Sequence, residues 1–184
     1  RPRSANTSRT RGVATGSGVA PAAWLIRHHF TRLLVGQDAR NINLIWDQLY
    51  RASLPYGRKG LAIMAISAVD LALWDLVGKV RGEPVYNLIG GLSRDEITFY
   101  CTGPDALAIK NLGFWGAKVP LPHGPFDGED GMTRNLAFLA RQRAAVGPDF
   151  PLMVDCYMSL TVNYAIRLAE AAKPLNIHWW EEVL

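Results

Sequence analysis

The chain has 184 residues, of which 49% are hydrophobic and 20% are charged, as is typical of a soluble globular protein with a sizeable core. Its net charge of +4 resides in four arginines among the first eleven residues, and the rest of the chain has as many acidic as basic residues. This balance does not indicate a nucleic-acid-binding face, so we expect no nucleic-acid partner. Charged residues interrupt the apolar runs before membrane-spanning length, so we expect no membrane partner either.

The first half of the sequence predicts helices. Residues 1–12 are rich in Arg, Ser and Thr and predict a disordered tail, with a strand remnant near Val13. Apolar residues then recur at helical spacing, and Gly or Pro follows two of the runs. The predicted helices are 22–34, 42–52 and 61–80, followed by a helical turn at 85–89.

The second half alternates strands and helices. The expected strands are 97–101, 114–119, 151–155 and 177–182, and the expected helices are 105–112, 132–146 and 161–173. This order predicts a parallel sheet with helices outside it. No strand is followed by a glycine-rich nucleotide-binding loop. Because the sequence lacks an initiator Met and ends directly after a strand, we expect a fragment: an α/β chain whose residues 93–184 form the first half of a (β/α)8 TIM-type barrel.

Two carboxylates carry the main functional signal. Asp155 and Glu181 each lie at or near the end of an apolar strand, and one helix separates the two strands. Parallel strands joined in this way lie side by side, about 4.8 Å apart, so the two carboxylates should converge. Two converging carboxylates ionise together only at a cost, unless a cation lies between them. We therefore expect them to form part of a Mg²⁺ site, although Asp155 alone could cap a helix and Glu181 alone could be solvated.

Three further residues lie where a barrel places its active site. Lys118 could act as a base or orient an anionic substrate, and burial would lower its pKa. Glu182 should alternate away from Glu181 in an extended strand and lie in the shell behind the metal ligands. His123, in the loop after the second strand, could contact substrate. Cys101 and Cys156 lack CxxC spacing and indicate reduced core thiols in a cytoplasmic protein.

Two segments carry a family resemblance. Residues 65–79 (AISAVDLALWDLVGK) and 84–91 (PVYNLIGG) resemble the signature helix of the mandelate racemase/muconate lactonizing branch of the enolase superfamily. The resemblance implies that residues 13–92 are part of an α+β capping domain and that Asp155 and Glu181 are the first two Mg²⁺ ligands. Members of that superfamily combine Mg²⁺ with a Lys or His base.

Within that branch, residues 116–120 (GAKVP) and 154–159 (VDCYMS) are most similar to the dehydratases that act on L-rhamnonate. Many branch members carry Lys-x-Lys at the second barrel strand, but the second position here is Pro120, so the resemblance implies a His base beyond Leu184. It also implies a Mg²⁺-dependent hydro-lyase that gives a 2-keto-3-deoxy sugar acid and forms a homo-oligomer at full length. Another sugar-acid dehydratase, a racemase and an inactive truncated chain remain alternatives.

Overall fold

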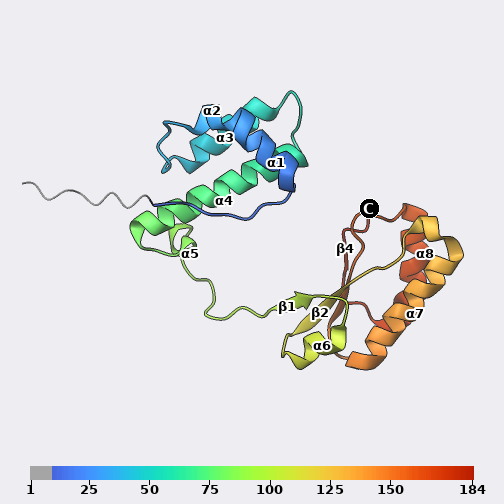
Figure 1. Ribbon diagram of the computed structural model, residues 1–184. Helices are drawn as coiled ribbons and strands as arrows, with labels where there is room; N and C mark the ends of the chain where they lie inside the picture. The colour runs from blue at the N-terminus through green and yellow to red at the C-terminus, as the bar shows by residue number, and fades with distance from the viewer. Residues whose placement is uncertain (1–9) are drawn as a thin grey trace, which may run out of the picture. The chain divides into compact units, whose positions relative to one another are not determined.

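The computed structural model describes residues 10–184, which form two compact units (Figure 1). The first unit ends at Ser93 and the second runs from Arg94 to Leu184. Most of the predicted tail lies outside the described residues. Each unit is described below by itself.

The first unit is helical, as its sequence predicts. The first predicted helix begins three residues early and contains a π-helical turn, η1; the next two are confirmed nearly to the residue. The elements are α1 (Val19–Leu25), η1 (Ile26–Phe30), α2 (Thr31–Leu34), α3 (Ile42–Ser53), α4 (Leu61–Arg81) and α5 (Val85–Leu88). Gly82, in a left-handed conformation that costs glycine little, follows the last residue of α4.

Helix α4 organises this unit. Ala65 and Ile66 are buried and pack with Phe30, Ile45 and Leu49 in one apolar core. The helix is also long and apolar enough to cross a membrane by length and composition alone, even though Asp70 and Asp75 interrupt its apolar run as expected. Core helices of globular proteins share this length and composition, and α4 packs its apolar residues against α1 and α3.

The segment before α1 lies along α4. The Val13 amide donates to Asp75 Oδ2 at 2.7 Å, and Lys79 Nζ donates to the Arg11 carbonyl at 3.1 Å. Gly12 approaches so closely that a Cβ there would lie 1.9 Å from the Ala72 carbonyl oxygen. Arg11 and Gly12, assigned to the tail by the sequence, therefore contact the helix. The strand remnant expected near Val13 is not present as a strand.

The second unit contains a parallel sheet of four strands in the order β1-β2-β3-β4, as predicted. The strands are β1 (Tyr100–Thr102), β2 (Gly116–Pro120), β3 (Leu152–Asp155) and β4 (Trp180–Glu181). The helices between them are α6 (Ala106–Asn111), η2 (Pro125–Asp127), α7 (Gly128–Val146), α8 (Val162–Ala172) and η3 (Lys173–Leu175). In Figure 1, α7 and α8 lie side by side next to the strands.

The two faces of this sheet have different roles. Successive side chains of a strand point to opposite faces. Ala117 and Val119 of β2 and Leu152 and Val154 of β3 belong to the apolar core that α6, α7 and α8 cover. Alternation then places the residues between them, including Lys118, on the opposite face. The charged candidates are therefore separated from the packed core by the thickness of one sheet.

The edge strands are shorter than predicted. β1 begins at Tyr100 rather than at residue 97, and Ile97 and Phe99 are exposed. β4 ends at Glu181, because Glu182 has a φ of +47°, which is incompatible with an extended strand. The expectation that Glu182 continues the strand is therefore wrong.

Arg143 of α7 fixes the entrances of β3 and β4. Its guanidinium donates to the carbonyls of Gly147 and Phe150, which precede β3, at 2.8 and 2.7 Å. It also donates to the carbonyls of Leu175 and Asn176, which precede β4, each at 2.8 Å. One side chain thus binds four main-chain carbonyls, and the fork geometry of arginine is what allows it.

We expect Arg143→Lys to lower the free energy of unfolding by about 2 kcal/mol, because an ammonium cannot donate to all four carbonyls. Urea denaturation followed by circular dichroism measures this. Arg141→Lys, two residues away and exposed, is the matched control and should change stability by less than about 0.5 kcal/mol. Equal effects of the two substitutions on stability would contradict this role of Arg143.

Candidate metal centre

The parallel register brings three charged side chains together. Asp155 pairs with Glu181 across β3 and β4, and Lys118 lies on the adjacent strand β2. Lys118 Nζ is 3.0 Å from Asp155 Oδ2 and 2.5 Å from Glu181 Oε1. The side chains of Lys118 and Asp155 are 9% and 8% exposed, and that of Glu181 is 33% exposed. The predicted convergence of the two carboxylates is present, around the ammonium group of Lys118.

The charge of Lys118 is stabilised by these partners. Burial lowers its pKa, but hydrogen bonds and charge from Glu181 and Asp155 outweigh burial and raise the pKa above its ordinary value of 10.5. The expected lowering of the Lys118 pKa is therefore wrong in sign, because burial acts on this residue together with two carboxylates that oppose it. Since the native-state pKa is raised, the stabilisation is fully present below pH 10.5 and is lost only as the pH rises through the raised value.

Three groups that the sequence analysis missed surround the cluster. The Tyr157 amide donates to Asp155 Oδ1 at 3.1 Å, and Trp179 Nε1 donates to Glu181 Oε2 at 3.3 Å. The ring of Tyr100 lies 6.0 Å from Lys118 Nζ and meets the Trp179 ring edge-on at 5.2 Å. The spacing Trp179-x-Glu181 contained a signal for one of them, because residues two apart in a strand share a face.

Glu182 is not part of this cluster. It is exposed, and within residues 10–184 its carboxylate forms no hydrogen bond or ion pair. Its main-chain carbonyl instead accepts a hydrogen bond from the Met158 amide at 2.5 Å. The structure therefore places the Glu182 backbone, rather than its side chain, next to the site.

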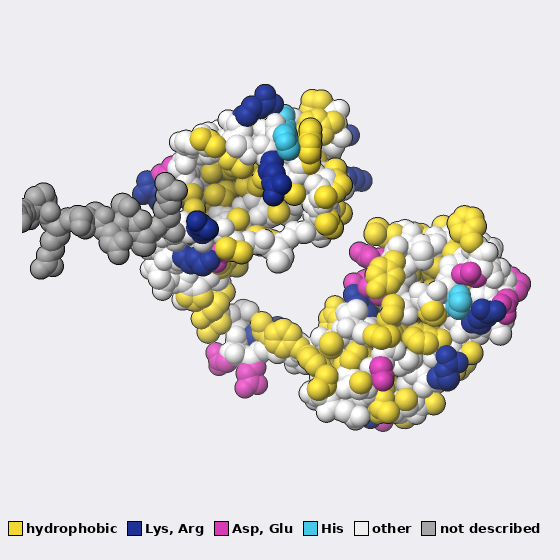
Figure 2. All heavy atoms as spheres, in the orientation of Figure 1, with side chains coloured by type: hydrophobic (Ala, Val, Ile, Leu, Met, Phe, Trp, Pro, Cys, Tyr) yellow, Lys and Arg dark blue, Asp and Glu magenta, His cyan; other side chains and the backbone are white. Residues whose placement is uncertain are grey.

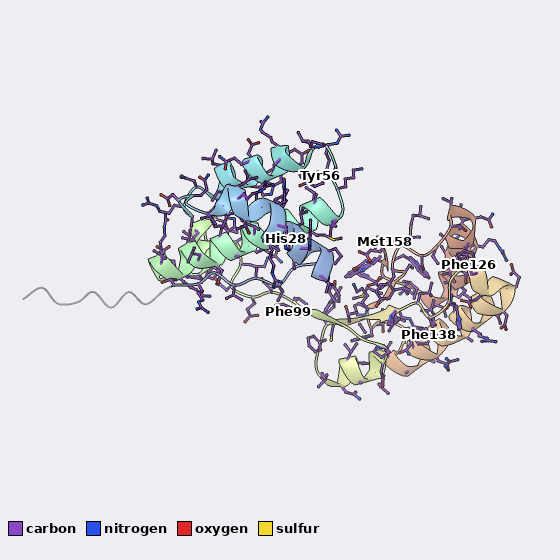
Figure 3. All side chains as sticks on the ribbon, turned by 45° about the horizontal axis from the view of Figure 1, so that its top comes forward. His28, Tyr56, Phe99, Phe126, Phe138 and Met158 are labelled. Carbon is purple, nitrogen blue, oxygen red and sulfur yellow. The ribbon has the colours of Figure 1, made fainter. Side chains whose placement is uncertain are left out.

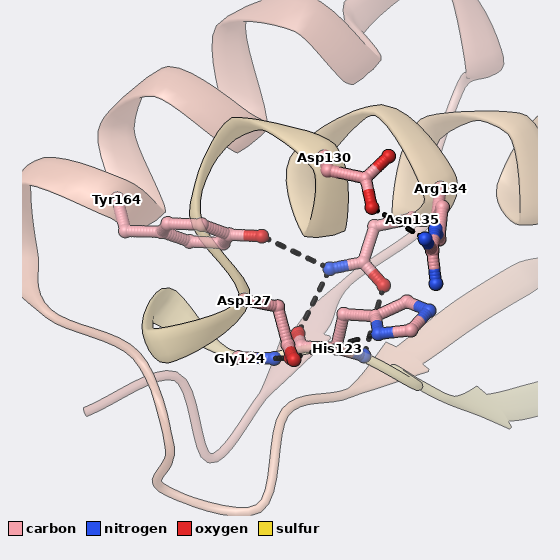
Figure 4. A network of polar contacts seen from close by, with 7 residues as sticks. All are labelled: His123, Gly124, Asp127, Asp130, Arg134, Asn135 and Tyr164. Atoms are coloured by element: carbon pink, nitrogen blue, oxygen red, sulfur yellow. Dashed lines mark hydrogen bonds and ion pairs between the residues drawn. The ribbon is translucent and has the colours of Figure 1, made fainter.

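His123 belongs to a separate network after β2 (Figure 4). Asn135 of α7 is fully buried; its Oδ1 accepts from the His123 amide at 3.1 Å, and its Nδ2 donates to the His123 carbonyl at 2.8 Å and to Tyr164 Oη at 3.1 Å. His123 Nδ1 lies 3.5 Å from Asp127 Oδ2. In the part of the chain that the structure describes, no hydrogen bond joins His123 to the charged cluster, so the network fixes the loop rather than the site.

The cluster fits a divalent cation only in part. Two carboxylates on adjacent strand ends converge on one position, and hard cations such as Mg²⁺ prefer oxygen ligands. However, no group of three or more His, Cys, Asp or Glu side chains that could hold a metal exists among residues 10–184. The adjacent thiol of Cys156 is a poor ligand, because burial and the charge of Asp155 raise its pKa to about 11.

Family models cover most of the chain. The N-terminal domain model of the mandelate racemase/muconate lactonizing enzyme family matches residues 11–90. A second model, described as enolase C-terminal domain-like, matches residues 106–184. The two matches fall in the helical unit and in the sheet-containing unit, respectively.

Individual relatives share the sequence and the fold. A Caldivirga maquilingensis protein named "Putative L-rhamnonate dehydratase" is 52% identical over 171 residues, which are 93% of this chain and 42% of that protein. The crystal structure of L-rhamnonate dehydratase from Gibberella zeae is 61% identical, with a TM-score of 0.87 over 94% of this chain and 44% of that one. The 3,6-anhydro-D-galactonate cycloisomerase of Zobellia galactanivorans is 35% identical, with a TM-score of 0.84 over 95% of this chain and 50% of that one. The chain thus spans about half the length of these relatives or less.

We expect Lys118→Met to lower the free energy of unfolding by about 3 kcal/mol at pH 7, because it leaves two neighbouring carboxylates without a cation. Millimolar Mg²⁺ should restore part of the loss. Lys173→Met, which breaks an exposed ion pair with Glu170, is the control and should have little effect. Thermal and urea unfolding measure both variants, and wild-type stability of Lys118→Met would contradict the cluster's role.

Proposed function

The chain belongs to the mandelate racemase/muconate lactonizing enzyme family of the enolase superfamily, and on this basis we propose that it carries part of a Mg²⁺-dependent acid-sugar dehydratase of the L-rhamnonate type. Residues 13–92 would belong to its capping domain, and residues 93–184 would supply the first four strands of its barrel. The observation that carries the proposal is the convergence of Asp155 and Glu181 at the carboxyl ends of adjacent parallel strands. In (β/α)8 barrels, active sites lie at that end of the strands.

Asp155 and Glu181 would hold the metal ion. Support comes from a solved relative, the rhamnonate dehydratase of Gibberella zeae complexed with Mg, which is 61% identical over 89% of this chain. When bound, Mg²⁺ would make the α-proton of a sugar-acid carboxylate more acidic and stabilise the resulting negative charge. The Tyr157 amide and the Trp179 indole would keep the two ligand carboxylates oriented.

Lys118 would orient the substrate rather than remove a proton. Its Nζ is held as an ammonium between two carboxylates, so it has no free lone pair to accept a proton. A fixed positive charge at this position suits the carboxylate of a sugar acid. Proton removal would then require a base outside residues 10–184, and loss of the β-hydroxyl as water would give a 2-keto-3-deoxy sugar acid.

The same proposal specifies the partners. The substrate is a small sugar acid, and the whole protein would be a cytoplasmic homo-oligomer without a nucleic-acid or membrane partner. In each unit, on the side drawn in Figure 2, Lys and Arg side chains are scattered among apolar and acidic ones rather than gathered into the basic stripe typical of nucleic-acid-binding proteins. A related enzyme of the same family that acts on another sugar acid is the second candidate, since the 35% identical relative is a 3,6-anhydro-D-galactonate cycloisomerase.

We expect the 184-residue chain alone to bind Mg²⁺ with a Kd above about 10⁻⁵ M and to turn over no sugar acid, because two carboxylates fill few of the six positions around Mg²⁺. Isothermal titration calorimetry measures the affinity. Asp155→Asn is the matched variant and should abolish the remaining binding. A Kd below that limit would show that this chain completes the metal site unaided.

Activity can be tested in a chimera that joins residues 13–184 to the complementary portion of the Gibberella zeae L-rhamnonate dehydratase. We expect it to dehydrate L-rhamnonate in preference to other sugar acids and to lose activity in EDTA. Glu181→Gln should lower kcat/KM at least about 10³-fold, whereas the exposed Glu170→Gln should leave it unchanged. Activity that survives EDTA, or turnover of mandelate instead, would refute the proposal.

A further inference from the structure

Both candidate ligands are followed closely by residues in an unusual backbone conformation. Tyr157 and Met158 have φ of +52° and +55°, and they come two and three residues after Asp155. Glu182 has φ of +47° and directly follows Glu181. Non-glycine residues rarely adopt this left-handed conformation, and those that do cluster at functional sites, where the surrounding structure holds them.

These residues form two linked turns. The Tyr157 amide donates to Asp155 Oδ1, 3.1 Å away, as in an Asx-turn, and the chain then reverses at Tyr157 and Met158. The Met158 amide donates to the Glu182 carbonyl at 2.5 Å. Between them, the Cys156 amide donates to the Glu181 carbonyl at 2.9 Å. Each turn therefore holds the other in place through the main chain.

We propose that this pair of left-handed turns, at Tyr157-Met158 and at Glu182, is a positioning device that sets the orientation of the Asp155 carboxylate and the spacing of the two ligand strands. The inference rests on the proposed metal site. An extended Tyr157 would carry the Met158 amide away from the Glu182 carbonyl and so release the loop that holds the Tyr157 amide beside Asp155. An extended Glu182 would move its carbonyl, which here accepts from Met158.

The role lies in the backbone rather than in the side chains. Tyr157 and Met158 are 56% and 65% exposed, and Met158 is one of the side chains labelled in Figure 3. Glu182 is exposed as well. Their side chains therefore contribute little to holding the turns. Glycine at these positions would relieve the strain but free the backbone to adopt other conformations.

Asn176 provides a matched control. It has φ of +48° and lies in the same unit, in the loop that precedes β4 rather than after it. Asn176→Gly frees a left-handed residue away from the carboxylates; the strain relieved is smaller, because Asn adopts this conformation more readily, and the main-chain carbonyl that Arg143 binds is kept. Met158→Ala is the second control, because it removes the side chain while keeping the left-handed restriction on the backbone.

The experiment measures metal affinity and backbone protection in the 184-residue chain. Mn²⁺, titrated by water-proton relaxation, is the probe, since this method detects weak sites. We expect Met158→Gly and Glu182→Gly to weaken Mn²⁺ binding at least five-fold without lowering Tm. Asn176→Gly and Met158→Ala should leave the affinity within two-fold of wild type.

Hydrogen exchange separates this inference from the metal site itself. Without metal, the Tyr157 and Met158 amides should exchange at least ten-fold faster in Glu182→Gly than in wild type or Asn176→Gly. If the wild-type chain binds no Mn²⁺ but the exchange rates still differ in this way, the proposed metal site is refuted and the proposed role of the two turns is supported. Unchanged exchange in Glu182→Gly, or unchanged Mn²⁺ affinity in both glycine variants of a binding chain, would overturn the inference.

Discussion

The constraint on which the site depends is the burial of Lys118 between two carboxylates. Parallel pairing places Asp155 opposite Glu181, and β2 supplies the ammonium that lies within 3.0 Å of both. A buried Asp155 carboxylate beside the partly exposed Glu181 carboxylate would be costly alone, and a single buried lysine would be costly as well. Each charge is tolerated because the others are there. The strand register is thereby tied to the chemistry, since a one-residue slip would turn one of the three toward the apolar face.

Strand alternation explains how one small sheet supports both a core and a site. Val119 and Val154 pack under the helices, while Lys118 and Asp155, their immediate neighbours in sequence, lie on the opposite face. A parallel sheet covered on both sides would have near-continuous apolar strands. The interruption of two such strands by charges therefore indicates a face reserved for something other than packing.

The sequence was sufficient to predict those features of the fold that depend on local patterns. Strand–helix–strand order and apolar runs predicted the parallel sheet and the convergence of Asp155 with Glu181. They could not predict the pKa direction of Lys118, because that depends on carboxylates up to 63 residues away. Nor could they place Glu182, whose left-handed φ is set by the loop that it pairs with. The missed Trp179 is different, because its spacing from Glu181 carried the signal.

The two ends of strands β3 and β4 have different roles, one in stability and the other in the candidate site. At their entrances, Arg143 binds four carbonyls of the loops that lead into β3 and β4. At their exits, Lys118 binds the two carboxylates. β3 and β4 are thus held by a cation at each end, but only the entrance cation has neutral partners. A divalent ion at the exit would compete with Lys118 for the same oxygens, while Arg143 holds the opposite ends of the two strands independently of the charges at the site.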